Sequence, residues 1–181
     1  YSDSTQSYKN ERFGGNLTWK IPINEYDNFY VGTGIERVQI QTFDNSSKRY
    51  KNFIKENDGD NKTGVGKYDA NVGKLTLGWG RNKLNHPYWP TKGYMTKFNS
   101  DFTIPGSDLE YYKFNFNNKF FIPVAEKSTI MLSGNIGYAD SYGKTKDLPF
   151  FESYGGGGLS SVRGYESNTL GPKVYDVDGS V

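Results

Sequence analysis

Cysteine is absent from this 181-residue sequence, so neither disulfide bonds nor thiolate metal sites can form within it. No stretch approaches the roughly 18 consecutive apolar residues that a membrane-spanning helix needs. Long runs of Lys or Arg are also missing, and the formal net charge is only +2, so we expect no nucleic-acid partner. The mean hydropathy of -0.77 is typical of a soluble protein. A membrane barrel can share that low average, however, because alternate residues face a wet lumen.

Alternation of apolar and polar residues fills most of the sequence, whereas a helical period is sustained nowhere. The clearest run lies at 112–122, and similar runs lie at 94–104 and 130–138. In the clearest run, one face is apolar and the other polar: Tyr112, Phe114, Phe116, Phe120 and Ile122 oppose Lys113, Asn115, Asn117 and Lys119. The pattern predicts an all-β, antiparallel up-and-down sheet with strands at about 11–21, 29–42, 68–81, 93–104, 110–122 and 129–139.

Two of these runs, 29–41 and 68–81, change phase once along their length. A β-bulge is one explanation, because an extra residue in a strand shifts every later side chain to the other face.

The connections between the predicted strands differ in length in a regular way. Short links at 22–28 and 123–128 contrast with a long polar link at 43–67 and a glycine-rich loop at 140–181. In an up-and-down sheet the last two fall on the same side. Short turns on one side and long loops on the other are typical of a transmembrane barrel. A soluble meander remains an alternative, because half-buried antiparallel sheets alternate in the same way.

Aromatic residues make up 17% of the chain, and many lie near predicted strand ends, as in the two girdles of a membrane barrel. We expect this of Trp19, Phe29, Tyr30, Trp79, Tyr88, Trp89, Tyr94, Tyr111, Tyr112, Phe120 and Phe121. The opposite face carries Lys97, Asp101, Lys113, Asn117 and Lys119. These side chains cannot enter a dry core unpaired, but a water-filled lumen accepts them. Six strands cannot close a barrel alone, and an open edge in lipid is forbidden, so we expect further strands elsewhere.

The stretch "FFESYGGGGLSSVRGYESNTLGPK" at 150–173 places four consecutive glycines ahead of an arginine. Such a run weakens a strand, because glycine loses much backbone freedom on ordering and offers no side chain to pack. The pattern predicts a loop that positions large side chains. The single histidine, His86, has no base and nucleophile around it, so we expect no catalytic residues and no enzyme activity. Asp58 and Asp60 beside Gly59 resemble part of a calcium loop, but Lys62 stands where an oxygen ligand is needed, so we expect no metal site.

The segment "PFFESYGGGGLSSVRGYESNTLGPK" resembles the long extracellular loop of the BamA family, the barrel subunits of bacterial outer-membrane protein assembly machines. The upstream stretches "IPINEYDNFYVGTG", "NKLNHPYWPTKG" and "FTIPGSDLEYYKF" resemble successive pieces of the same barrel, so the resemblance covers nearly the whole chain. It implies that 1–181 is part of a single sixteen-stranded outer-membrane barrel domain, with about six central strands.

The resemblance also implies a function, the folding and insertion of β-barrel proteins into the bacterial outer membrane. Implied partners are unfolded outer-membrane protein clients, outer-membrane lipid and accessory assembly lipoproteins, with no cofactor. Two-partner secretion transporters and autotransporter assembly factors share the loop signature and remain alternatives. A passive outer-membrane pore or a soluble β-sandwich binding module are alternatives of another class.

In the family, the loop folds back into the barrel lumen, which implies a lumen-directed motif here at Val162, Arg163, Gly164 and Tyr165. The arginine would contact acidic and aromatic wall side chains on strands that follow the loop and lie outside this chain. The glycines would act as a hinge that lets the backbone approach the wall closely: Gly155, Gly156, Gly157 and Gly158.

Overall fold

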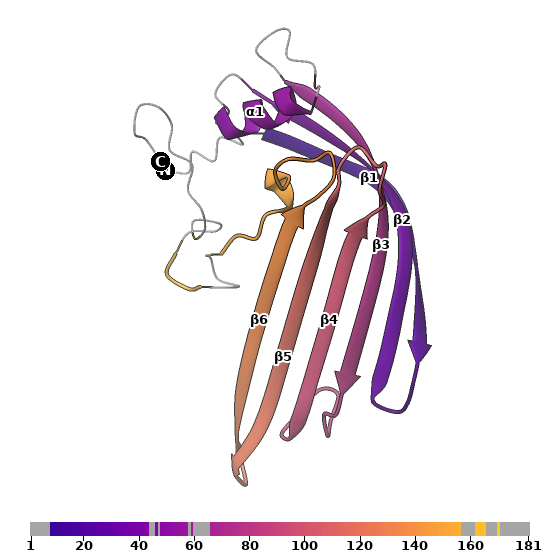
Figure 1. The fold of residues 1–181 in the computed structure, drawn as a ribbon. Coiled ribbons are helices and arrows are strands. Elements are labelled where there is room, and N and C mark those ends of the chain that lie inside the picture. Colours follow the sequence, from indigo (N-terminus) through magenta and orange to yellow (C-terminus); the bar gives the residue numbers. More distant parts are fainter. Residues whose placement is uncertain are drawn as a thin grey trace.

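The computed structural model describes residues 8–43, 46, 48–57, 59, 66–156, 162–165 and 170. It contains one six-stranded antiparallel sheet whose strands follow one another in chain order (Figure 1). The strands are β1 (Tyr8–Pro22), β2 (Asp27–Thr42), β3 (Lys67–Asn82), β4 (Gly93–Thr103), β5 (Tyr111–Ala125) and β6 (Ser128–Ser141). The predicted all-β, up-and-down architecture is confirmed. Each expected strand range overlaps one of the observed strands, and their ends differ by a few residues.

A short helix, α1 (Lys48–Glu56), lies in the link between β2 and β3, where the sequence predicted only a polar connection. The sequence did not predict this helix, because the helical spacing of its apolar residues Tyr50, Phe53 and Ile54 covers little more than one turn and is too short to stand out. A helix this short is marginal by itself and depends on packing. Ile54 is fully buried, which supplies that packing. Within the described residues, no helix is long and apolar enough to cross a membrane.

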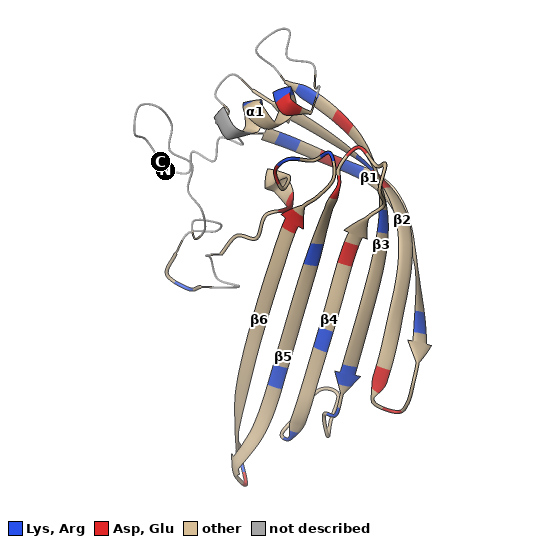
Figure 2. Cartoon of the chain, viewed as in Figure 1, with Lys and Arg blue, Asp and Glu red and all other residues tan. Residues whose placement is uncertain are grey.

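The outer face of the sheet carries a continuous band of exposed apolar side chains. Residues paired across neighbouring strands lie on the same face, so the register places Ile21, Phe29, Trp79, Phe98, Phe116 and Ile136 in one row of this band. The band also contains Phe13, Leu17, Ile35, Leu75, Phe120, Leu132 and Tyr138, and several of these are more than half exposed. Figure 2 shows charged residues along the strands, and the register places two of them at the upper end of this face: Arg37 lies opposite Phe13, the last ring of the band, and Asp69 lies beyond it.

The inner face bears α1 and the 3-10 helix η1 (Phe150–Glu152), and the buried core lies there, at the end of the sheet near the long links (Figure 1). Aromatic rings from both helices meet in it, with the Phe53 and Phe150 centroids 5.5 Å apart. Tyr111 is a core residue, only 2% exposed, so it does not belong to the aromatic girdle expected of it. The other buried core members are Val38, Ile40, Ile54, Tyr68, Ala70, Val72 and Leu109.

The phase change in β2 and β3 has a different cause from the bulge that the sequence allowed. The two strands pair without a register shift from Asp27 opposite Arg81 to Gln41 opposite Lys67. What changes along each strand is the face that carries the apolar side chains. In β2, Ile35 points outward and is 74% exposed, whereas Val38 points inward and is 2% exposed. The bulge explanation is therefore wrong: the apolar face switches from the outer band to the inner core partway along an unbroken strand.

The upper parts of β1, β2 and β3 bend over toward the inner side (Figure 1). Glycines allow the close approach of strands at this bend. A Cβ atom at Gly14 would lie 2.4 Å from the carbonyl oxygen of Ile35, and one at Gly34 would lie 3.0 Å from the Cβ of Asn16. Side chains at these two positions would force the backbones apart. The bend carries the strand ends and α1 over the inner space.

Candidate functional site: the inner wall and the base of the glycine-rich loop

The inner wall is polar along the length of the apolar outer band. The register places Lys97, Asp101, Lys113, Asn117 and Lys119 on this inner face, opposite the exposed aromatic rings of β4 and β5. Several of these side chains find partners on neighbouring strands. Thr76 donates a hydrogen bond of 2.7 Å to Asp101, and Lys113 reaches the residues that follow β6. The wall is thus suited to a water-filled lumen.

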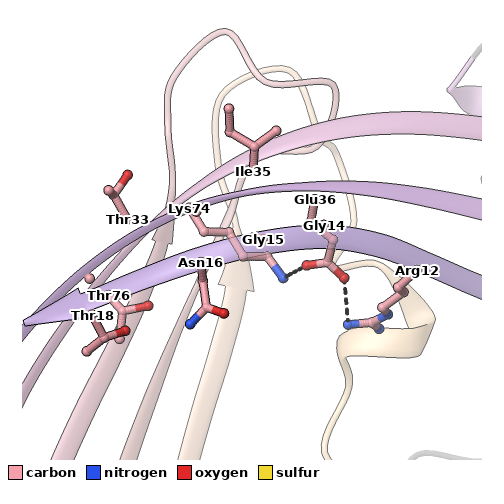
Figure 3. Close-up of a pocket in the computed structure, with 12 residues that line it drawn as sticks. Arg12, Gly14, Gly15, Asn16, Thr18, Thr33, Ile35, Glu36, Lys74 and Thr76 are labelled. Carbon is pink, nitrogen blue, oxygen red and sulfur yellow. Dashed lines mark hydrogen bonds and ion pairs between the residues drawn. The ribbon is translucent and has the colours of Figure 1, made fainter.

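A chain of alternating charges crosses the inner wall near the bend. Lys74 of β3 pairs with Glu36 of β2, which lies 3.6 Å from Arg12 of β1 (Figure 3). Arg12 in turn lies 2.8 Å from one oxygen of Glu152, in η1, and Lys113 of β5 lies 2.8 Å from the other. The Lys113 contact is an aligned hydrogen bond, whereas the Arg12 contact is a charge contact without that alignment. One carboxylate of the segment after β6 therefore contacts both β1 and β5.

Glu152 is almost fully buried at this junction. Burial by itself opposes ionisation, but the hydrogen bond from Lys113 and the charges of Lys113, Arg12 and Lys74 outweigh it and lower the pKa of the Glu152 carboxyl. The carboxylate is thus ionised at neutral pH.

Aromatic residues beside Glu152 hold the same segment against the wall. The Tyr154 hydroxyl donates to Oδ1 of Asn115 at 2.6 Å and lies 3.2 Å from the carbonyl oxygen of Phe114. Its ring lies against Gly137, where an added Cβ would come within 2.7 Å of it. The Lys113 ammonium stands 5.0 Å from the Tyr154 ring, and the Arg12 guanidinium 5.2 Å from the Phe151 ring. Residues 150–154 thus form a docked base for the glycine-rich loop.

A second set of hydrogen bonds joins two connections at the same end of the sheet. The Glu110 carboxylate, in the β4–β5 turn, accepts backbone hydrogen bonds from Gly106 and Lys144, each 2.7 Å long. These two N–H donors lower the pKa of the Glu110 carboxyl. Gly143 makes this contact possible. Its φ is +62°, and a Cβ there would lie 1.8 Å from a Glu110 oxygen.

A cavity of about 320 Å³ lies beside the charge chain, on the inside of the bend. Its walls are largely backbone and short polar side chains, including Gly14, Gly32, Gly34, Asn16, Thr18 and Thr76 (Figure 3). No group of three or more His, Cys, Asp or Glu side chains suited to a metal ion occurs in the described part of the chain.

The residues singled out from the sequence lie farther along the loop than this docked base. Val162, Arg163, Gly164 and Tyr165 are all exposed, and Gly164 has a left-handed φ of +98°. Arg163 forms no ion pair or hydrogen bond with another described residue, so its expected luminal contacts stay a prediction.

Of the expected hinge glycines, Gly156 pairs with Leu170 in an isolated antiparallel bridge, with both N–O distances 2.9 Å. This bridge holds Gly156 and Leu170 side by side. Gly155 precedes it, and Gly157 and Gly158 lie outside the described residues.

Sequence reasoning missed Glu152, Tyr154 and Arg12, the residues that dock the loop. A signal for the first two was present: "FFESY" places one acidic residue among four aromatic and small residues directly before the glycines. No signal in the sequence marked Arg12, because it lies about 140 residues earlier and only the fold brings it close.

Comparison with known proteins shows the family to which this chain belongs. The family model described as the Omp85 superfamily domain matches residues 1–180. The chain belongs to the Omp85 superfamily. It is similar to the outer membrane protein assembly factor BamA of Neisseria meningitidis serogroup B, with 43% identity over 178 residues, which are 98% of this chain and 22% of that protein. The BamA of Nitratidesulfovibrio vulgaris is 25% identical over 177 residues, covering 92% of this chain and 20% of that protein.

A solved structure is also similar to this Omp85 chain. It is the crystal structure of BamA from Haemophilus ducreyi lacking POTRA domains 1–3, with a TM-score of 0.83 and 28% identity. The match covers 95% of this chain and 33% of the solved one. The resemblance drawn from the sequence is confirmed, as is the membrane-barrel fold, so the soluble β-sandwich alternative was wrong. The chain is an outer-membrane protein, and it spans about a fifth of the length of its curated relatives.

Proposed function

We propose that this chain forms part of the barrel wall of an assembly factor that folds and inserts β-barrel proteins into the bacterial outer membrane. The observation that carries this proposal is the 43% identity to Neisseria BamA, which extends over 98% of the chain and so includes both the wall and the loop. The loop motif Val162–Tyr165 (sequence VRGY) alone would support only the wider group of assembly and secretion barrels. Sequence identity to Neisseria BamA along the strands as well supports an assembly factor.

The role that we propose is physical and not enzymatic. The apolar outer band holds the sheet in lipid, and the polar inner wall faces water. β1 and β6 each have one unpaired edge among the described strands, and in lipid these edges require further strands of the same barrel. Unfolded outer-membrane proteins would be the clients, and accessory lipoproteins would be additional partners.

Reconstitution of the full-length protein tests this function. Vesicles containing it should speed the folding of an added, urea-unfolded outer-membrane barrel, measured as client that resists protease. Empty vesicles and vesicles with an unrelated porin provide the controls. A passive pore would conduct ions steadily without speeding client folding, and a secretion barrel would pass its partner across the membrane without inserting barrels.

We further propose that Arg163 braces the loop tip against wall residues outside this chain. Arginine suits this task because its guanidinium offers five donors in a rigid fork and forms bidentate pairs with carboxylates. In the full-length protein, Arg163→Ala should lower the amount of assembled barrel or its resistance to unfolding on a gel. Arg163→Lys keeps the charge without the fork and should show a smaller loss. Unchanged assembly and resistance in Arg163→Ala would refute the bracing role.

A further inference from the structure

We propose that Glu152 is a positioning residue that sets the curvature of the upper barrel wall and, through the same contacts, fixes where the glycine-rich loop enters the lumen. The inference does not depend on which clients the barrel handles. It concerns the base of the loop and is separate from the Arg163 motif at its tip.

Glu152 joins two strands that lie far apart in the sheet. β1 and β5 are separated by three strands in the sheet. At about 4.8 Å per strand spacing, the path across the sheet is about 19 Å. The register adds about 20 Å along the strands, because Lys113 falls in the row of Thr18, six residues from Arg12 on β1. Yet Arg12 and Lys113 each lie 2.8 Å from an oxygen of the same carboxylate. The carboxylate therefore bridges the inside of the arc, and it can keep both contacts only while the wall stays curved.

Burial distinguishes this bridge from ordinary surface ion pairs. The side chain of Glu152 is 7% exposed and that of Lys113 is 19% exposed. On the outer face, Arg37 and Asp69 pair across β2 and β3 with both side chains 55% exposed. Exposed pairs contribute little, whereas removing one partner of a buried pair leaves a charge without compensation. The Arg37–Asp69 pair is therefore a matched control within the same sheet.

The bridge also fixes the loop. Glu152 belongs to η1, and Tyr154 holds the next turn of chain against β5 through Asn115. Lys113 contacts both of these residues, by an ion pair to Glu152 and by its position over the Tyr154 ring. Wall curvature and loop position consequently share one set of contacts, so a change in either one changes the other.

Distances between spin labels would test this proposal in the full-length protein. Labels are attached at Lys9→Cys on β1 and Asp140→Cys on β6, two exposed outward positions that report the width of the arc. Glu152→Gln keeps the shape of the side chain and removes its charge. We expect a longer and broader label distance in Glu152→Gln, and no change in the control Asp69→Asn. An unchanged distribution in a folded Glu152→Gln protein would overturn the proposal.

A double-mutant cycle separates bridging from general destabilisation. If Glu152 acts through Lys113, then Lys113→Gln should lengthen the label distance by itself and add little to Glu152→Gln. Additive effects of the two changes would refute the bridge. If Glu152→Gln yields no folded barrel, Lys113→Gln provides the test in its place. This change removes only the contact of Glu152 with β5 and leaves its contact with Arg12. A normal label distance in Lys113→Gln would then count against the proposal.

Discussion

A charge placed at the centre of the outer band should destabilise the barrel far more than the same charge placed above it. On β1 the band runs from Phe13 to Ile21, with Leu17 at its middle. These roughly nine residues span about 27 Å along the strand, or about 20 Å across the membrane at a typical tilt of about 40°. Leu17 therefore lies about 10 Å from either edge of the band, where lipid leaves an arginine few routes to water.

Arginine at such a depth costs about 2–4 kcal/mol, which lowers the folded-to-unfolded ratio about 30-fold to 900-fold. We therefore expect Leu17→Arg to lower the urea midpoint of the full-length protein in phospholipid vesicles. The control is Gln39→Arg, which points outward from β2 beyond the band and should cost no more than about 1 kcal/mol. Equal losses in the two variants would refute the assignment of the band to lipid.

Three further outcomes follow from the loop contacts, each in the full-length protein. Gly137→Leu should displace the ring of Tyr154 from the wall, which protease cleavage of the loop would report as faster cutting. Gly143→Ala should destabilise the barrel by about 1–3 kcal/mol, because alanine is strained at its φ of +62° and its Cβ would meet Glu110; thermal unfolding on a gel would measure this. Because folding lowers the pKa of Glu152, its ionised carboxylate should stabilise the barrel fully at pH values above about 4.3, the usual pKa of glutamate. This contribution should be lost as the pH falls through the lower pKa of the folded state.

Matched variants identify the cause in each case. Gly134→Ala lies on the open outer face of β6, with no atom within 4 Å of the added Cβ, and should leave loop cleavage unchanged. Gly106→Ala has a similar left-handed strain at φ +93° and keeps the N–H that Glu110 accepts, but its Cβ meets no atom within 4 Å, so its difference from Gly143→Ala measures the clash with the Glu110 carboxylate. Glu152→Gln should lose less stability than the unmodified protein in thermal unfolding on a gel when the pH is lowered from about 7 to well below about 4.3. Equal acid sensitivity would contradict the pKa argument.

The sequence predicted the strands well because alternation reports which side of a strand faces lipid. In β5, Phe114 and Phe116 face outward while Lys113 points inward, as the pattern indicated. The prediction failed where a second partner covers the other face. Val38 and Ile40 of β2 are apolar because α1 covers them, and the sequence offered no way to separate that effect from a bulge.

The docked base of the loop was predicted only in part, for a similar reason. The glycine run marked a loop, and the resemblance drew attention to Arg163 at its tip. The residues that the structure brings together lie just before the glycines, and Glu152 finds its partners on β1 and β5. Contacts between residues so distant in the chain follow from the closing curvature of the sheet, and periodicity within one strand carries no information about that curvature.

Because the apolar face of β2 and β3 switches sides, each of these strands needs two different apolar surroundings, lipid for one half and packed protein for the other. The lower half is stable only with hydrocarbon against its outer face, and the upper half only with α1 and the loop base against its inner face. A strand in lipid without α1 would expose Val38 and Ile40 to water, and a strand capped by α1 in water would expose Phe29 and Ile35. Lipid against the outer face and α1 with the loop base against the inner face are therefore both needed for the same strands to be stable.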